Sequence, residues 1–352
     1  MIKKYNKGEW SEFYVFIKLL CEKKIYFFDS KLNKTNKFYK ILNIYRNEEK
    51  HFIYSVELSK IVKNDEDFKS TFIIDENKLK PFIKKILTSL TQNKGSSFSI
   101  EYINEIFKII KSNHIKLGSS YDKSDIVISI DDNNFKDQKI GFNIKSYLGN
   151  PPTLLNSSLA TNFKYEIEDF RGDLSLVNNI FTKNKIRDRL IYLKNKSAKI
   201  KFIGLDNDIF NKNLCLIDSQ MSEILSVFLL NFYLGNGNKI NQISKNYQDL
   251  FKNISSEFVI YKVQTFLLNI ALGMVPSKAW DGYDNANGYI ILKKDGEVGC
   301  FDILNKKILA QYLFDNTRFD TPSSSRHRFG ILYMENGKFF IKLNLQIRFE
   351  NF

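Results

Sequence analysis

Residues 124–157 constrain the fold more than any other part of this chain. They read SDIVISIDDNNFKDQKIGFNIKSYLGNPPTLLNS. Two strand-like runs, 126–130 and 140–145, are joined by a polar stretch that is rich in turn-forming residues. Because side chains alternate across a strand, Asn143 and Lys145 point to the same face of the second run. The stretch therefore predicts a β-hairpin with polar groups gathered along one face.

Asp125 stands at the start of the first strand and could meet Asn143 and Lys145 at one open edge of the hairpin. A carboxylate and an amide oxygen can hold a divalent cation that activates a water, and an ammonium group can orient that water. Metal-dependent nuclease hairpins follow this pattern, although they have Asp or Glu where this chain has Asn143. The plain alternative is that Asp125 merely starts a strand and Lys145 is one solvated lysine among 53 basic residues. The motif alone leaves both interpretations open.

Two glutamates of the first predicted helix could supply the missing carboxylate. Apolar residues recur at helical spacing over residues 8–22, with Glu9 and Glu12 on a flanking face. Glu12 is the first choice, because the helix dipole alone explains an acidic residue in the first turn, where Glu9 lies. The predicted metal ligands are Asp125, Asn143, Glu12 and Glu9, and the predicted catalytic residues are Asp125, Lys145, Asn143 and Glu12.

The composition favours a polyanionic partner. The net charge is +14, although lysine, asparagine and isoleucine are frequent throughout, as an AT-rich genome would produce. Three widely separated cysteines provide neither a disulfide framework nor metal-ligand spacing, which indicates a reducing, cytoplasmic setting. We expect no signal peptide and no membrane span. The absence of glycine-rich phosphate loops and of GxSxG argues against a nucleotide-driven motor and a serine hydrolase.

Arginine is scarce in this chain, yet three arginines gather in residues 317–328, TRFDTPSSSRHR. Guanidinium groups and hydroxyls are suited to contacts with guanine edges and phosphates, although a polar surface loop is the simpler alternative. Short hydrogen-bonding side chains in residues 150–162 and a polar face on the last predicted strand extend this set. The predicted DNA-binding residues are Arg318, Arg326, His327, Arg328, Gln346, Arg348, Asn156, Ser157, Ser158, Thr161 and Asn162.

The organisation of the chain is that of a mixed α and β protein. Apolar periodicity predicts helices over 8–22, 76–92, 100–112, 219–234 and 257–272. Strand-like runs fill 25–75 and most of 288–349, whereas 160–205 mixes both signals. A soft boundary near residue 205 would separate a nuclease core region, 1–205, from a helical and then β-rich region, 206–352, that contributes to DNA recognition. A single domain is the alternative.

Three long blocks of this chain resemble the HpaII-type type II restriction endonucleases. They are NKGEWSEFYVFIKLL near the start, GFNIKSYLGNPPTLLNSSLATNF in the middle and RFDTPSSSRHRFGILYMENGKFFIKLNLQIRF near the end. Three blocks in the same order are far more specific than one short motif. Residues 165–285 contribute little to the resemblance.

The resemblance implies a PD-(D/E)XK-like α/β (α+β) nuclease core, a mixed β-sheet flanked by helices, with a β-rich C-terminal region. It also implies Mg²⁺-dependent double-strand cleavage at a short palindrome, with CCGG the name-giving target of the family. Asp125 then takes the metal-binding acidic position, Lys145 the position of the catalytic lysine, and Asn143 the second acidic position. Ser124 replaces the proline of the general motif.

Double-stranded DNA is the expected partner. A palindrome suits a two-fold homodimer, although a monomer can nick twice. A companion DNA methyltransferase is expected to protect the host without forming a stable complex. Two alternatives are a repair or mobile-element nuclease of the same fold and a non-catalytic DNA-binding protein whose site has decayed, because fold does not fix function.

Overall fold

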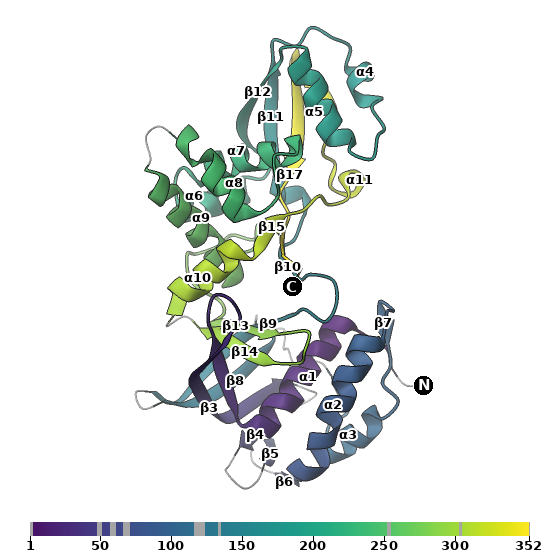
Figure 1. The fold of residues 1–352 in the computed structure, drawn as a ribbon, viewed down its shortest axis with the longest axis vertical. Helices are drawn as coiled ribbons and strands as arrows, with labels where there is room; N and C mark the ends of the chain where they lie inside the picture. Colours follow the sequence, from purple (N-terminus) through teal and green to yellow (C-terminus); the bar gives the residue numbers. More distant parts are fainter. Residues whose placement is uncertain are drawn as a thin grey trace. The chain divides into compact units, whose positions relative to one another are not determined.

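The computed structural model describes residues 3–47, 51–56, 61–65, 71–115, 124–132, 135–251, 255–302 and 305–351. The chain divides into two compact units (Figure 1). The first comprises Met1–Pro152, Asn285–Leu309 and Asn351–Phe352, and the second comprises Thr153–Asp284 and Ala310–Glu350. The boundary predicted near residue 205 falls inside the second unit.

The first unit contains a large sheet and three principal helices. Its elements are β1 (Tyr5–Asn6), α1 (Lys7–Glu22), β2 (Lys24–Phe28), β3 (Lys34–Asn47), β4 (His51–Val56), β5 (Ile61–Asp65), β6 (Thr71–Ile74), α2 (Glu76–Gln92), β7 (Ser97–Phe98), α3 (Ile103–Ile110), β8 (Ile126–Asp132), β9 (Phe135–Ser146), β13 (Gly288–Leu292) and β14 (Val298–Asp302). The three helices predicted in this part of the chain are confirmed, and so is the hairpin, as β8 and β9.

The sheet of the first unit has nine strands in the order β2-β14-β13-β9-β8-β3-β4-β5-β6. The pairs β13–β9 and β14–β2 are parallel, and the other pairs are antiparallel. Strand β2 also pairs with β3, so six of the strands form a closed ring. A mixed sheet agrees with the predicted fold class, whereas the closure was not predicted.

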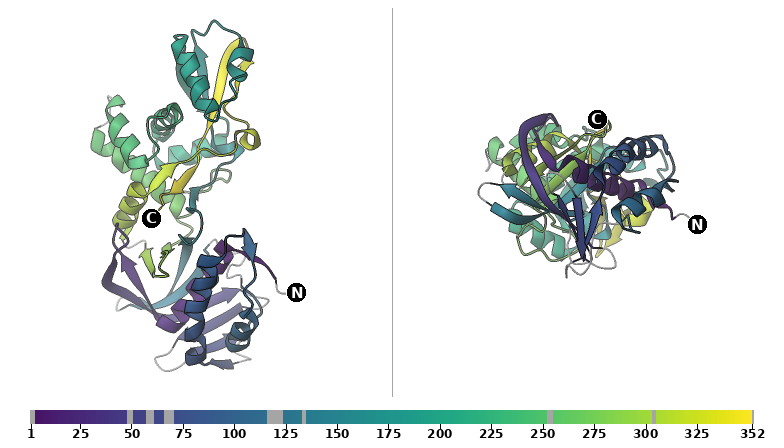
Figure 2. Two further views of the ribbon diagram at one scale, coloured as in Figure 1. Left: turned by 45° about the vertical axis from the view of Figure 1, so that its right-hand side comes forward. Right: turned by 90° about the horizontal axis from the view of Figure 1, so that it is seen from below.

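Helix α1 is the centre of the first core. Helices α1, α2 and α3 lie together on one face of the sheet (Figures 1 and 2). Trp10, Phe13 and Phe16 of α1 are fully buried in the same apolar cluster as Phe142 of β9. The Trp10 indole donates to the carbonyl of Phe98, at 3.0 Å, so its one polar group is satisfied. This packing fixes α1 against the hairpin.

The second unit is built from two small sheets and a group of helices. Its elements are β10 (Thr153–Leu155), η1 (Leu159–Thr161), β11 (Asn162–Glu168), α4 (Leu174–Asn178), α5 (Lys185–Asn195), β12 (Lys199–Leu205), α6 (Asp208–Ile217), α7 (Met221–Leu234), α8 (Ile240–Tyr247), η2 (Gln248–Leu250), α9 (Ser256–Ala271), most of α10 (Lys306–Asp315), β15 (Thr317–Phe319), α11 (Ser324–His327), β16 (Leu332–Glu335), β17 (Lys338–Asn344) and β18 (Ile347–Phe349). The helices predicted over 219–234 and 257–272 are confirmed as α7 and α9.

The two sheets are antiparallel, with the orders β12-β11-β17-β16 and β10-β18-β15. The predicted turn between β16 and β17 is confirmed. The prediction of a mostly extended C-terminal tail missed helix α10. Leu309, Tyr312 and Leu313 recur there at helical spacing and are fully buried, so that helical signal was available in the sequence.

Among the described residues, no single helix is long and apolar enough to cross a membrane. Helices α6 and α7 meet the same length and composition test only as a pair, and that pair is bent by 109°.

Candidate active site

The hairpin places Asp125, Asn143 and Lys145 next to one another. Strands β8 and β9 pair in register, with Ile126 opposite Phe142, and the same register carried one residue further sets Asp125 opposite Asn143. Phe142 is buried in the core beneath the sheet, whereas Asn143 and Lys145 are only half-buried. The predicted alternation along this strand is therefore confirmed.

The carboxylate of Asp125 is held by the neighbouring strand. Its Oδ2 accepts a hydrogen bond from the backbone N–H of Ile144 at 2.7 Å, and its own N–H donates to the carbonyl of Phe142 at 2.9 Å. Burial raises the pKa of this carboxyl, while the Ile144 hydrogen bond and the charge of Lys145 oppose the rise. The group is thus oriented and only partly solvated, as a metal-binding carboxylate needs to be.

Lys145 lies in the electrostatic field of two carboxylates. Burial lowers the pKa of its ammonium, and the charges of Asp125 and Glu12 counteract that effect. The ammonium also lies 5.5 Å from the centre of the Tyr289 ring, which belongs to the strand on the other side of β9. The hairpin therefore sets Asp125 close to Lys145, and the charge of Glu12, on the first helix, acts on the same ammonium.

Tyr289 was missed in the sequence, because nothing local marks it. It lies in a run that reads simply as a buried strand, and its ring is nearly inaccessible to solvent. Only the parallel pairing of β13 with β9, which sets Tyr289 beside Asn143, brings the ring to the lysine. A long-range strand pairing of this kind has no signature in a single sequence.

Glu9 and Glu12 have different surroundings. The side chain of Glu9 accepts from the N–H of Asn6 at 2.9 Å, and the Asn6 side chain accepts from the N–H of Glu9 at 2.9 Å. This reciprocal pair is a capping box at the start of α1. Glu12 lies one turn further along the helix, and its charge reaches Lys145. The structure thus accounts for Glu9 through helix capping, and its role as a metal ligand stays a prediction.

The donors at this site suit Mg²⁺ in kind. Two carboxylates, Asp125 and Glu12, and the side-chain amide of Asn143 offer the hard oxygen ligands that Mg²⁺ prefers, and Mg²⁺ typically keeps several waters as well. Within the described ranges, no three His, Cys, Asp or Glu side chains are grouped so that they could hold a metal ion. The candidate metal ligands are therefore two carboxylates and one neutral amide. An acidic residue in place of Asn143 would give three carboxylates.

Gly141 supports the hairpin next to the candidate site. Its N–H donates to the side-chain oxygen of Asn287 at 3.0 Å, and its carbonyl accepts from the N–H of Asn287 at 2.8 Å. A Cβ at this position would lie 2.6 Å from Oγ of Ser124 and 3.0 Å from its Cβ. Ser124 directly precedes Asp125, so a side chain at position 141 that pushes Ser124 away would also displace the Asp125 carboxylate.

We therefore expect Gly141→Ala to destabilise the protein by about 1–3 kcal/mol, as overpacking usually does. The cleavage rate per folded molecule should also fall, because the added methyl group displaces Ser124 and with it Asp125. Denaturant unfolding and a cleavage assay on the same samples separate the two effects. Adding Ser124→Gly removes the crowded atoms and should restore both properties. Unchanged stability and cleavage in Gly141→Ala alone would contradict this account.

The predicted DNA-binding residues all lie in the second unit, but their surroundings differ. Arg318 and Arg348 both form ion pairs with Asp320, at 3.2 and 2.7 Å, and are paired across β15 and β18. The N–H of Asp320 donates to the carbonyl of Gln346 at 3.1 Å. Asp320 thus holds two guanidinium groups side by side on one small sheet.

A polar network occupies the interior beside this sheet. The imidazole of His327 lies 3.0 Å from Oγ of Ser157, and the Gln346 amide donates to the same oxygen at 3.4 Å. Asn162 donates to the carbonyl of His327 at 3.0 Å. Thr161 and Asn162 are almost fully buried. Asn344 joins them, donating to Asn162 and to the carbonyl of Ser158 at 2.7 Å each.

This network separates the predicted DNA contacts into two kinds. Ser158, Thr161 and Asn162 have partners inside the protein and stabilise the junction of β11 and β17. Asn156, Arg326 and Arg328 are exposed. The exposed side chains are available to a ligand. The side chains with internal hydrogen bonds would instead contribute by keeping the backbone of this region in place. Their roles in DNA binding stay predictions.

Comparisons with known proteins agree with these observations. The family model described as HpaII restriction endonuclease matches residues 6–349. The chain is 38% identical over 362 aligned positions to the type II restriction enzyme HpaII of Haemophilus parainfluenzae, and the alignment covers 98% of each chain. No solved structure matches the chain significantly.

Proposed function

We propose that this chain, which belongs to the HpaII restriction endonuclease family and is a type II restriction enzyme, makes Mg²⁺-dependent double-strand breaks in DNA. The proposed target is the palindrome CCGG. The catalytic part is supported by the register of the β8–β9 hairpin, which sets Asp125 opposite Asn143 and close to Lys145, and by the charges of Asp125 and Glu12, which both act on the Lys145 ammonium. These features support a hydrolytic site for phosphodiesters in a restriction-endonuclease-like core.

Asp125, Glu12 and the amide of Asn143 would hold the metal ion. When bound, Mg²⁺ neutralises phosphate charge and lowers the pKa of a coordinated water. The neutral amide at position 143 brings no charge, so the affinity for the ion rests on the two carboxylates. This predicts a higher Mg²⁺ requirement than that of a site with three carboxylates.

Lys145 would orient the attacking water and stabilise the charge that builds on the phosphate oxygens. The Asp125 and Glu12 charges favour its ammonium form, against the effect of burial. The Tyr289 ring beneath the ammonium limits its movement and adds a cation–π attraction. The protein thereby presents a positioned cation where negative charge develops, at little reorganisation cost.

Fragment mapping tests this proposal. A plasmid with known CCGG sites, digested by the full chain in Mg²⁺, should yield discrete fragments with uniform ends at those sites. The same plasmid methylated at CCGG should resist, because a companion methyltransferase must protect the host. Smearing, cutting at junctions only, or binding without any cleavage in Mg²⁺ or Mn²⁺ would contradict the proposal.

We further propose that the enzyme acts as a homodimer on its palindrome, since a two-fold target matches a two-fold assembly. Sedimentation of the protein with and without a CCGG duplex checks this. One copy per duplex throughout would contradict a dimer and would indicate sequential nicking by a monomer.

The binding of DNA should depend on pH through His327. Desolvation and the nearby charge of Arg326 hold the pKa of this imidazole below its ordinary value. DNA phosphates favour the protonated ring, so the affinity for DNA should rise by roughly threefold to tenfold as pH falls through that pKa.

The pH dependence of folding stability that comes from His327 has the opposite sign. The unfolded chain takes up this proton first, and stability is lost as pH falls below the ordinary imidazole range.

His327→Gln should make affinity nearly independent of pH in this range, while His114→Gln, in the first unit, serves as the control. Fluorescence anisotropy with a labelled duplex measures both. An unchanged pH dependence in His327→Gln would show that another group is responsible.

A further inference from the structure

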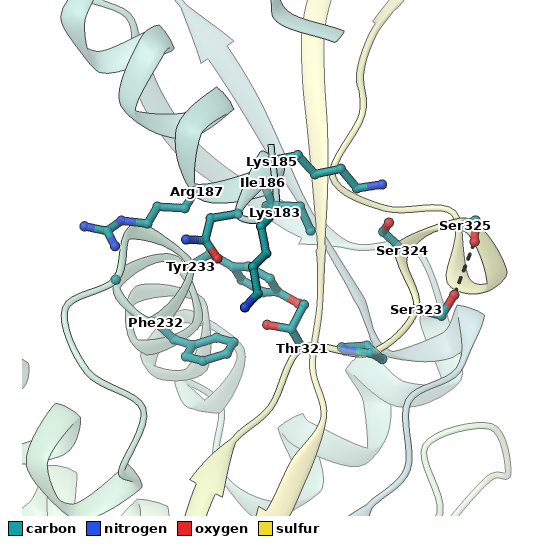
Figure 3. A pocket seen from close by; sticks show the side chains of 13 residues that line it. Lys183, Lys185, Ile186, Arg187, Phe232, Tyr233, Thr321, Ser323, Ser324 and Ser325 are labelled. Carbon is teal, nitrogen blue, oxygen red and sulfur yellow. Dashed lines mark hydrogen bonds between the residues drawn. The ribbon is translucent and has the colours of Figure 1, made fainter. Parts of the chain in front are cut away.

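A pocket of about 580 Å³ lies in the second unit between the start of α5 and the segment that precedes α11 (Figure 3). We call it the α5 pocket. Its lining residues are Lys183, Asn184, Lys185, Ile186, Arg187, Phe232, Tyr233, Gly235, Thr321, Pro322, Ser323, Ser324 and Ser325. Cations therefore come from one segment and hydroxyls from another, far away in sequence.

Three basic residues line the pocket from one segment, Lys183, Lys185 and Arg187, at alternate positions of the sequence KNKIR. In Figure 3 the side chain of Lys185 extends toward Ser324, and Lys183 extends toward Thr321. Arg187 extends the other way, over the end of α7, where a Cβ on Gly235 would lie 2.7 Å from its Nε. Lys183 and Lys185 are thus the cations best placed to meet a ligand in the pocket.

The cations of the pocket have no acidic partner among the residues that the structure describes. Lysines of the nearby sheet are mostly paired, as Lys199 is with Asp169, Lys201 with Glu168 and Lys338 with Glu166. By contrast, no carboxylate in the described part of the chain forms an ion pair with Lys183, Lys185 or Arg187, and none lines the pocket. Uncompensated cations in a concave site attract anions.

The opposite side supplies hydroxyl groups suited to an anion's oxygens. Thr321, Ser323, Ser324 and Ser325 line it, and the Ser323 and Ser325 hydroxyls lie 3.2 Å apart. Ser324 and Ser325 also line a second pocket of about 270 Å³, together with Arg328 and Lys342. The two pockets therefore share the hydroxyls of Ser324 and Ser325, and Arg328 adds a basic side chain on the far side of them, whereas Lys342 is paired with Asp206.

We propose that the α5 pocket binds phosphates of the DNA backbone, with Lys183 and Lys185 as its cationic contacts and the 321–325 hydroxyls as hydrogen-bond donors. Lysines and hydroxyls contact phosphates without reading bases. The contact is therefore independent of sequence and orients the duplex on the second unit. This inference rests on the proposed action on DNA and adds a binding site to it.

The test is the salt dependence of DNA binding by the full chain, measured by fluorescence anisotropy without divalent metal. Two duplexes are compared, one with CCGG and one with the site scrambled. A plot of log affinity against log salt concentration has a negative slope. In the Lys183→Ala/Lys185→Ala variant this slope should become less steep by about 1.8, since each lost phosphate contact removes about 0.9 from its magnitude. Both duplexes should weaken by the same factor.

The matched control is Lys194→Ala/Lys196→Ala, which removes the same charge at the far end of α5, away from the pocket. Its slope should match that of the wild type. The single variants Lys183→Ala and Lys185→Ala, each expected to lower the slope by about 0.9, replace the double variant if it unfolds. An unchanged slope, an equal effect of the control, or weakening confined to the CCGG duplex would overturn the proposal.

Omitting divalent metal separates this inference from the catalytic proposal. A failure of the slope to change, with normal cleavage by the wild type, would refute the pocket alone. A changed slope in a protein that never cuts would refute the proposed cleavage and leave the pocket standing.

Discussion

Lys145→Ala is expected to lower the rate of DNA cleavage by a factor of about 10²–10⁴, the range over which one positioned proton-transfer or charge-stabilising group usually acts. The variant removes an ammonium on which the charges of both Asp125 and Glu12 act. The affinity for duplex DNA should change little, because one ammonium contributes about one phosphate contact. Single-turnover cleavage with saturating Mg²⁺ measures the chemical step.

Lys139→Ala is the matched control for Lys145→Ala. Lys139 lies on the same strand and also faces an aromatic ring, at 4.4 Å from the centre of Tyr45, but it is exposed. It should cleave at nearly the wild-type rate. Asp125→Asn keeps an oxygen for the Ile144 N–H and loses only the charge, so it should resemble Lys145→Ala. The two losses should not add, since the groups act together. Cleavage at the parental rate in Lys145→Ala would place the active site elsewhere.

Glu12→Gln and Glu9→Gln should differ sharply, although the two glutamates are three residues apart on one helix. Glu12→Gln removes a carboxylate beside Lys145, and we expect cleavage to fall by about 10²-fold or more, with a raised Mg²⁺ requirement. Glu9→Gln keeps a side chain that can still accept from Asn6, so its loss of stability should stay below about 1 kcal/mol.

Magnesium titration of the cleavage rate, together with denaturant unfolding, distinguishes these outcomes. Glu12→Gln should retain the wild-type midpoint of unfolding while its cleavage curve shifts to higher Mg²⁺. Glu9→Gln should retain the wild-type cleavage curve. The reverse pattern, with a cleavage defect confined to Glu9→Gln, would assign the second carboxylate to Glu9.

Local patterns sufficed for several elements near the site. Helix α2, β8, β9 and the β16–β17 hairpin follow from apolar periodicity and turn residues, because these signals depend on residues a few positions apart. Helix α10 was not predicted although its apolar spacing is present in the sequence, because the helix is short and has strand-like runs on both sides. The composition of the two units has no local signal in the sequence, because β13 and β14 join a sheet whose other strands lie more than a hundred positions earlier.

The sequence by itself determined the hairpin, the faces of its side chains and the membership of the chain in its family. These depend on alternation along one strand and on long ordered blocks of residues. Only the tertiary structure decided that the charge of Glu12 acts on Lys145, that the Tyr289 ring lies beside this lysine, and that Lys183 and Lys185 share a pocket with distant serines. Those contacts arise when buried apolar surface draws remote segments together, and a linear pattern does not encode which segments will meet.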